Sequence, residues 1–270
     1  MRLATAQSTL SADVRGNGAH LRALMRQAAA AGARLLHCPE AALSGYAKAQ
    51  IAHWDAVDWG TVQAELEALA RLAARLGIWV VLGCNHRLGP PQHPSNSLYV
   101  ISDRGEVAAR YDKRICSHTE LSGWYTPGTD PLVFEVDGIR FGCALCIEVC
   151  FPEIFAEYER LGVHCVLLSA YSEDPIHGVM ARAHAATNSY WLSLATPAAC
   201  SAWLPSAQIG PDGHGIGACA PGEPGLTLCT IDPAAPEFEV ALRRARPWRA
   251  EARGRRPPED GALPVPGGAR

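Results

Sequence analysis

The chain has 270 residues, of which 48% are hydrophobic and 19% charged, and its formal net charge is −3 at pH 7. This length and composition indicate a globular protein with a substantial core, built as one large α/β domain or two smaller ones. The small negative charge gives no electrostatic reason to expect nucleic acid as a partner, and no apolar run approaches the roughly 18–20 residues of a membrane span. The ten cysteines are scattered without paired spacing, which is typical of reduced thiols, so we expect a soluble cytoplasmic protein.

The first half of the chain alternates between strand and helix patterns. Asn17 is expected to cap an amphipathic helix that Gly32 ends, and Gly77 is expected to end a second one. In order, the pattern predicts a strand over residues 2–7, a helix over 17–31, a strand over 34–38, a helix over 61–76, and strands over 78–83, 96–102 and 107–111.

Two charged residues follow these elements at positions that suit function. Glu40 comes after the strand over residues 34–38 and is either the N-terminal charge of a helix or a functional carboxylate; its position alone favours the helix charge. Lys113 lies in a long polar loop over residues 112–128, and long loops in compact domains are often functional. The chain has only two lysines against 22 arginines, so each lysine is a candidate for chemistry that arginine cannot perform, with chance survival as an equal alternative.

The second half of the chain begins with a hairpin that turns at Asp137 and Gly138. Pro152 suits the first turn of a helix, where its missing N–H costs nothing. In order, the pattern predicts strands over residues 132–136 and 139–146, a helix over 152–160, a strand over 163–169, a helix over 176–188, and strands over 190–195, 204–209, 226–231 and 238–242.

This alternation of strands and helices, with hairpins inserted, indicates a layered α/β core. No stretch has the composition of a linker that would divide it. The last two dozen residues are rich in Arg, Pro and Gly, which is typical of an extended or disordered segment. We therefore predict one domain over residues 1–245 and an Arg/Pro/Gly-rich C-terminal tail over residues 246–270.

Three cysteines, Cys143, Cys146 and Cys150, lie where the strand over residues 139–146 turns toward the next helix. Their spacing superficially resembles a metal-ligand cluster, but side chains three apart on a strand point to opposite faces, and there is no second C-x-x-C pair. We therefore expect no metal site. Cys146 stands at the carboxyl end of a buried strand, where open α/β sheets bind ligands, so we predict that it is a nucleophile.

If the fold brings Glu40, Lys113 and Cys146 together, each group has a chemical role. Glu40 would act as general base, and Cys146 would attack an electrophilic carbon to form an acyl-thioester. Lys113 and the backbone N–H of Ile147 would stabilise the negative charge on the substrate oxygen. A carboxylate alone would make a buried thiol harder to ionise, and the lysine is expected to correct this effect.

Three motifs, in this order along the chain, resemble those of the nitrilase superfamily, the carbon–nitrogen hydrolases, over about residues 1–242. The glutamate motif is Pro39-Glu40 with Leu43, Gly45 and Tyr46; the lysine motif is Tyr111-Asp112-Lys113-Arg114 with Glu120 and Pro127-Gly128; the nucleophile motif is Cys146-Ile147-Glu148 with Phe151-Pro152-Glu153.

The resemblance implies an α/β fold, a four-layer αββα sandwich of the nitrilase/carbon–nitrogen hydrolase type, with a Glu40–Lys113–Cys146 triad assisted by Glu120. It implies hydrolysis of a non-peptide C–N bond of a small amide or carbamoyl compound through a cysteine acyl-thioester, releasing ammonia or an amine. No cofactor is implied. The resemblance also implies a homodimer or higher homo-oligomer, often with C-terminal segments that reach over the partner.

The pocket around the triad is less well defined by the sequence. Many family members have an aromatic residue where this chain has Ile147, which changes the pocket wall but leaves the backbone N–H for the oxyanion site. Tyr46 and Tyr171 are candidates for pocket walls and equally for the edge of the core. Two other functions stay open: a catalytically decayed binding or scaffold protein, and an acyltransferase in which an amine replaces water.

Overall fold

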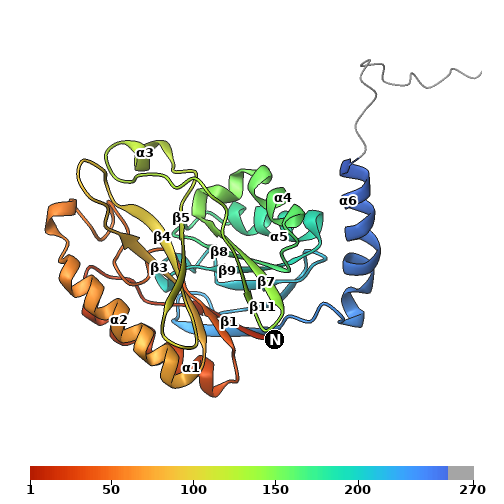
Figure 1. Cartoon of the computed structure of the whole chain (residues 1–270), viewed down its shortest axis with the longest axis horizontal. Helices are drawn as coiled ribbons and strands as arrows, with labels where there is room; N and C mark the ends of the chain where they lie inside the picture. The colour runs from red at the N-terminus through yellow and green to blue at the C-terminus, as the bar shows by residue number, and fades with distance from the viewer. Residues whose placement is uncertain (255–270) are drawn as a thin grey trace, which may run out of the picture.

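The computed structural model describes residues 1–254 and contains two six-stranded β-sheets packed face to face (Figure 1). The first sheet contains, in spatial order, β12 (Gly225–Thr230), β1 (Arg2–Gln7), β2 (Leu35–His37), β3 (Trp79–His86), β4 (Ser95–Ile101) and β5 (Val107–Asp112). The second contains β11 (Gly215–Ala218), β10 (Ala207–Ile209), β9 (Trp191–Ala195), β8 (Cys165–Ser169), β7 (Ile139–Leu145) and β6 (Val133–Val136).

Each sheet has a pair of helices on its outer face. The helices α1 (Val14–Ala30) and α2 (Trp59–Leu76) pack on the first sheet, and α4 (Pro152–Arg160) and α5 (Ile176–Asn188) pack on the second. A third apolar cluster, which includes Leu35, Val100 and Phe141, fills the space between the sheets. The predicted four-layer αββα sandwich is therefore confirmed.

The central strands of each sheet run parallel, and this arrangement positions the candidate functional residues. In the first sheet β1, β2 and β3 are parallel, and in the second β7, β8 and β9 are parallel. Glu40 follows the carboxyl end of β2, Cys146 follows that of β7, and Tyr171 follows that of β8. Ligands bind at the carboxyl ends of such strands, so this edge of the sandwich is where a site is expected.

Several predicted boundaries are confirmed by backbone geometry. Gly77 ends α2 with a left-handed φ of 65°, and Pro152 occupies the first turn of α4. Asp137 and Gly138 have φ values of 50° and 79° and join β6 to β7, as the hairpin prediction required. Positive φ at both central residues gives the turn a twist that matches that of the strands.

The prediction that Asn17 caps α1 is wrong. The cap is Asp13, whose side chain accepts a hydrogen bond from the Arg15 N–H, and Asn17 lies one turn inside the helix. Asn17 is buried there and donates to the Leu43 carbonyl, so it joins α1 to the segment that follows β2. Asp and Asn cap helices equally well, and the sequence alone did not distinguish the two.

The prediction of a strand over residues 238–242 is also wrong. This stretch contains the end of a 3-10 turn (Pro236–Phe238) and the start of a π-helical turn (Val240–Ala245). Phe238 and Leu242 both pack against the core between the sheets, whereas Val240 is exposed. Two apolar residues four apart on one face suit a helix, but with Val240 between them they also alternate like a strand. The strand β11, which is exposed and rich in glycine, was not predicted.

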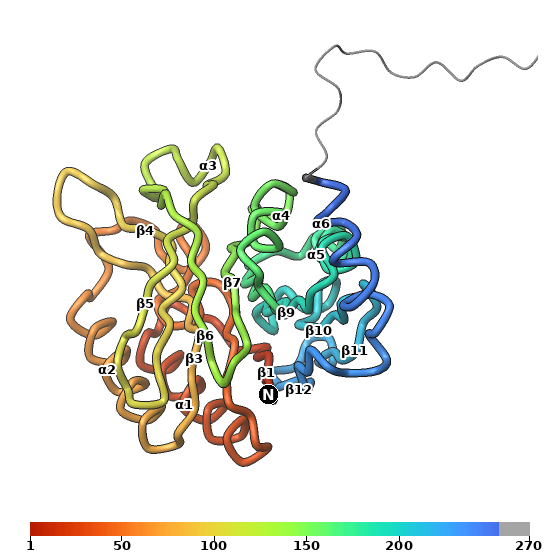
Figure 2. Tube along the Cα trace, turned by 45° about the vertical axis from the view of Figure 1, so that its right-hand side comes forward, coloured from red at the N-terminus to blue at the C-terminus, as the bar shows by residue number. Residues whose placement is uncertain are grey.

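The predicted tail is helical where the structure describes it. The helix α6 (Arg246–Gly254) stands beside α5 in both views of the chain (Figures 1 and 2), and the remainder of the predicted tail, residues 255–270, lies outside the described residues. The arginines of α6 bind α4, α5 and the segment that follows α4: Arg246 donates to the Val163 carbonyl, Arg249 to the Ala186 carbonyl, and Arg253 to Glu159. Cations at helix C-termini satisfy carbonyls that lack intrahelical partners. The arginines of this segment therefore serve a defined contact.

We expect removal of α6 to lower the free energy of unfolding. A chain that ends at Ala245 loses these arginine contacts, at a cost on the order of 1–2 kcal/mol because the side chains are partly exposed. Urea denaturation followed by circular dichroism measures the change. A chain that ends at Gly254 retains α6 and is the matched control; equal stability of the two truncations would contradict the role of the arginines.

Candidate active site

The nucleophile candidate occupies a strained turn at the end of β7. Cys146 has a φ of 49°, a left-handed value that is unfavourable for a residue with a side chain. It begins the 3-10 turn Cys146–Cys150, which leads into α4. Strain of this kind concentrates at functional sites, where a particular side chain is needed in place of glycine. Cys143 is fully buried in the core between the sheets, and Cys150 is exposed at the far end of the turn, so Cys146 is the one buried thiol of this turn.

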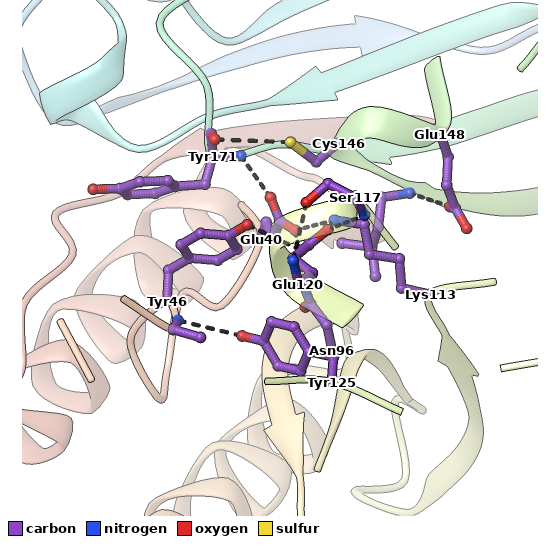
Figure 3. Close-up of polar contacts among 12 residues, drawn as sticks. Glu40, Tyr46, Asn96, Lys113, Ser117, Glu120, Tyr125, Cys146, Glu148 and Tyr171 are labelled. Carbon is purple, nitrogen blue, oxygen red and sulfur yellow. Dashed lines mark hydrogen bonds and ion pairs between the residues drawn. The ribbon is translucent and has the colours of Figure 1, made fainter. Parts of the chain in front are cut away.

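Glu40 is fully buried in an irregular turn after β2, and both of its oxygens are occupied (Figure 3). Its Oε1 accepts hydrogen bonds from Asn96 Nδ2 at 2.7 Å and Lys113 Nζ at 3.1 Å, and its Oε2 accepts one from the Tyr171 N–H at 2.7 Å. A Cβ at Gly83 would lie 2.1 Å from the Pro39 carbonyl oxygen, so this glycine permits the turn to pack against β3. Glu40 begins no helix, and the alternative that it is a helix N-terminal charge is excluded.

Lys113 bridges two buried carboxylates. Its Nζ lies 3.1 Å from Glu40 Oε1 and 2.8 Å from Glu120 Oε1, and only 1% of the lysine side chain is exposed. Glu120 belongs to the short helix α3 (His118–Leu121), whose capping box with Ser117 fixes its side chain. The predicted loop thus contains one helical turn, and that turn presents Glu120 to the lysine.

The charges within this cluster perturb one another. Burial raises the pKa of Glu40 above its usual range, although the Lys113 charge opposes the shift. Burial would also raise the pKa of Glu120, but Lys113 and hydrogen bonds hold it below its usual range. Burial would lower the pKa of Lys113, and the surrounding negative charges keep it well above its usual range. The lysine is therefore a stable ammonium, and Glu40 is a stronger base than an exposed glutamate.

The thiol of Cys146 joins this cluster through Tyr171. Cys146 Sγ lies 3.7 Å from the Tyr171 carbonyl oxygen, and the N–H of the same residue donates to Glu40 (Figure 3). Burial raises the pKa of the Cys146 thiol above its usual range, and Glu40 raises it further, while Lys113 opposes the shift without cancelling it. The expectation that the lysine would correct the thiol pKa is therefore wrong in net direction. The thiol stays protonated at neutral pH and needs a base to react.

The predicted pocket residues lie around this cluster. The rings of Tyr46 and Tyr171 stack with their centroids 4.8 Å apart, and the Tyr46 hydroxyl donates to Glu120 Oε1 at 2.9 Å. Tyr46 therefore donates to the carboxylate that binds Lys113, and its role as a pocket wall stays a prediction. Ile147 is half-buried in the turn after Cys146, and its oxyanion role stays a prediction.

The supporting roles of two residues, Asn96 and Glu148, were missed from the sequence. Asn96 on β4 donates to Glu40, as described above. Glu148 is fully buried and accepts hydrogen bonds from four groups: the Leu145, Arg114 and Ile115 N–H groups and the Tyr111 hydroxyl. It therefore ties the nucleophile turn to the lysine loop. A carboxylate in an otherwise apolar turn was the available signal, because a buried charge must find partners.

No cluster of three or more metal-ligating side chains occurs among residues 1–254, and the ten cysteines, all within that range, form no disulfide. The same part of the chain has no helix with the length and apolar character needed to cross a membrane.

Comparison with known proteins identifies the family. The sequence matches the carbon-nitrogen hydrolase family over residues 2–237. It is 24% identical over 246 residues to a chloroplastic omega-amidase of Arabidopsis thaliana, covering 84% of this chain and 66% of that protein, just under two thirds of its length. It is 27% identical over 256 residues to the deaminated glutathione amidase of Homo sapiens, covering 85% of this chain and 76% of that protein.

A solved structure agrees with this match. The amidase from Nesterenkonia sp. AN1, in a form with the acetamide moiety of fluoroacetamide added covalently at its active-site cysteine, superimposes with a TM-score of 0.78 at 25% identity. The superposition covers 93% of this chain and 96% of that chain. On its sequence match and its fold, the chain belongs to the carbon-nitrogen hydrolase family.

Proposed function

We propose that this protein hydrolyses the non-peptide C–N bond of a small amide or carbamoyl compound through an acyl-thioester on Cys146, releasing ammonia or an amine. The observation that carries the proposal is the buried Glu40–Lys113–Glu120 cluster beside a strained cysteine. The amidase names of the relatives support amides as the substrate class. Glu40, Lys113, Cys146 and Glu120 are the proposed catalytic residues.

The first half of the reaction forms the acyl-enzyme. Glu40 removes the Cys146 proton as Sγ attacks the carbonyl carbon, and the C=O electron pair moves onto oxygen. The Lys113 ammonium and the Ile147 N–H stabilise that oxyanion. Collapse of the tetrahedral intermediate breaks the C–N bond, and the proton held by Glu40 passes to the leaving nitrogen. Ammonia or an amine departs, and the acyl group stays on sulfur.

The second half of the reaction restores the enzyme. Glu40, again a carboxylate, removes a proton from water as the water oxygen attacks the thioester carbonyl. The intermediate collapses with release of the carboxylic acid, and Glu40 returns its proton to sulfur. Lys113 keeps its charge through both halves because its pKa is raised well above its usual range, so it stabilises charge and does not transfer protons. Glu120 holds the lysine in place.

A substrate panel tests the proposal. Ammonia release is measured for small amides, ureides and nitriles, and the intact protein mass is measured within a single turnover. Turnover accompanied by an acyl mass increase is expected with at least one amide or ureide. If no compound is turned over and no adduct forms, the scaffold alternative is favoured. If adducts form but turn over only when an amine is added, the protein is an acyltransferase.

The pH dependence of kcat/KM follows from the Glu40 base. Because the pKa of Glu40 is raised above 4.5, its usual value, activity is expected to rise with pH through an acid limb that lies above pH 4.5. In Glu120→Gln one negative neighbour is removed, so this limb should move to lower pH. Steady-state rates between pH 4 and 9 locate the acid limb in the unmodified protein and in Glu120→Gln. An acid limb at or below 4.5 in the unmodified protein would contradict Glu40 as the base.

We also propose that the protein works in the cytoplasm as a homodimer or higher homo-oligomer. Ile176 and Val179, which are 48% and 59% exposed, lie on one face of α5, and the 70% exposed Trp203 precedes Leu204, which packs near Gly178. Exposed apolar groups that gather in this way mark interaction surfaces. Sedimentation velocity measures the assembly, and a monomer at micromolar concentration would contradict it. The division of the chain at residue 245 likewise stays a prediction.

A further inference from the structure

The apolar core between the two sheets contains a layer of polar side chains. Its members lie on strands of both sheets: Thr5 on β1, His37 on β2, Ser169 on β8, Ser193 on β9 and Gln208 on β10. The first four are 0% exposed and Gln208 is 1% exposed. Burying a polar group costs free energy unless the group is hydrogen-bonded, so the side chains of this layer are expected to bond to one another.

The histidine is the centre of this layer. His37 Nε2 lies 2.8 Å from Ser169 Oγ, and His37 Nδ1 lies 2.7 Å from Ser193 Oγ, so one imidazole of the first sheet bonds two neighbouring strands of the second. Ser169 Oγ continues to the Cys38 carbonyl oxygen at 2.8 Å. On the other side, Ser193 Oγ lies 2.7 Å from Thr5 Oγ1, which lies 3.0 Å from Gln208 Nε2.

The Cys38 carbonyl at one end of this series fixes which group donates in each hydrogen bond. The Cys38 carbonyl can only accept, so Ser169 donates its single proton there and must accept from His37 Nε2–H. Burial lowers the pKa of His37 to about 3, so the ring is neutral and Nδ1 is an acceptor for the Ser193 hydroxyl. Ser193 then accepts from Thr5, and Thr5 accepts from the Gln208 amide. Every proton in this series of hydrogen bonds therefore has one defined position.

The two ends of the Ser169 link lie next to the candidate active site. Cys38 is two residues before Glu40, and Ser169 is two residues before Tyr171. Tyr171 donates its N–H to Glu40 and accepts from Cys146 Sγ through its carbonyl. The distance between the ends of β2 and β8 therefore determines where Glu40 and the Tyr171 backbone lie relative to the thiol.

We propose that His37 is a positioning residue for the active site: through Ser169 it holds the ends of β2 and β8 at the separation that Glu40 and Tyr171 need. The proposal rests on the proposed function. His37 touches neither the substrate nor the reacting atoms in this arrangement. The two ring nitrogens of His37 have different roles. Nε2 is connected through Ser169 to the active site, whereas Nδ1 is connected through Ser193 to Thr5 and Gln208, away from the site.

Two serine variants distinguish the roles of the two ring nitrogens. Ser169→Ala and Ser193→Ala each remove one buried hydroxyl and leave one imidazole nitrogen without its partner, so both should lower the melting temperature to a similar degree. Only Ser169→Ala breaks the link to the Cys38 carbonyl. We expect it to lower kcat about tenfold at nearly constant KM, whereas Ser193→Ala changes kcat by less than about twofold, since small displacements of catalytic groups have large effects on rate.

A pair of histidine variants repeats the test from the other side. In His37→Gln the amide Nε2 lies near the position of the imidazole Nε2 and can still donate to Ser169, so kcat should be largely retained. In His37→Asn the shorter amide reaches only toward Ser193, and kcat should fall as in Ser169→Ala. If a histidine variant does not fold, the two serine variants decide alone.

A second readout keeps this inference separate from the proposed function. The rate of Cys146 alkylation by iodoacetamide, followed by peptide mass mapping, needs no amide turnover and should fall in Ser169→Ala but not in Ser193→Ala. If the unmodified protein turns over no amide, the proposed function fails while the alkylation ratio still reports on His37. The positioning role is overturned if the two serine variants change kcat and alkylation equally, or if neither variant changes them.

Discussion

Replacing Cys146 with alanine is expected to abolish amide turnover, with kcat lowered by at least about 10³-fold, because the acyl-thioester cannot form without the sulfur nucleophile. The acyl adduct seen by intact mass should disappear at the same time. The substitution leaves the positive φ at this position in place, so the free energy of unfolding should change little. Loss of activity without loss of stability is the combination that identifies a nucleophile.

A neighbouring cysteine and a second substitution at Cys146 provide the controls for this experiment. Cys150→Ala changes an exposed thiol at the end of the same turn and should retain full activity. Cys146→Gly should be inactive and at least as stable as the unmodified chain, because glycine relieves the strain of a left-handed backbone. Retention of turnover by Cys146→Ala, or transfer of the adduct to another cysteine without loss of rate, would refute the mechanism.

Lys113→Met is expected to remove activity and also to lower the free energy of unfolding by about 3–5 kcal/mol, because a buried charge cluster loses its only cation. Without the ammonium, the buried carboxylates of Glu40 and Glu120 are left without a counter-charge. Lys48→Met is the matched control: it changes the only other lysine, which is exposed, and should shift stability by less than about 0.5 kcal/mol.

The pH dependence of Lys113→Met provides a check on this cause. Two buried carboxylates without a counter-charge have pKa values raised above those of the unfolded chain. Stabilisation by protonating them is present at low pH and is lost as the pH rises through the raised values. The variant should therefore be more stable, relative to the unmodified protein, near pH 5 than near pH 8. Urea denaturation at both pH values measures this, and a pH-independent difference would point to lost packing alone.

The sequence predicted those parts of the fold that local chemistry determines. Gly77 and Pro152 mark helix ends because backbone freedom or a missing N–H permits little else there. The buried strands were recognised because burial on both faces favours apolar residues at most of their positions. By contrast, Asn17 and residues 238–242 each satisfied two local rules at once. Contacts with distant segments decided between them: the hydrogen bond from Asn17 to the Leu43 carbonyl, and the packing of Phe238 and Leu242 against the core between the sheets.

The active site was predicted unevenly for a related reason. Glu40, Lys113 and Cys146 are separated along the chain, and the family motifs, not their spacing, suggested that they meet. Glu148 belongs to the nucleophile motif and His37 to none, but neither was assigned a role, because their partners come from other strands and loops. Hydrogen bonds between distant segments depend on register and layer packing, which no local pattern of residues encodes.

The arginine-rich composition has a practical consequence for studying this protein in solution. Since one lysine is buried in the charge cluster and Lys48 is exposed, an amine-reactive dye should attach to a single side chain of the folded protein. Lys48 lies two residues after Tyr46 and two before Gln50, whose amide donates to the Tyr171 hydroxyl. A fluorophore on Lys48, introduced without mutagenesis and distinguished by peptide mapping from dye on the N-terminal amine, would thus lie next to the proposed pocket residue Tyr46 and is expected to report ligand binding as a change in emission.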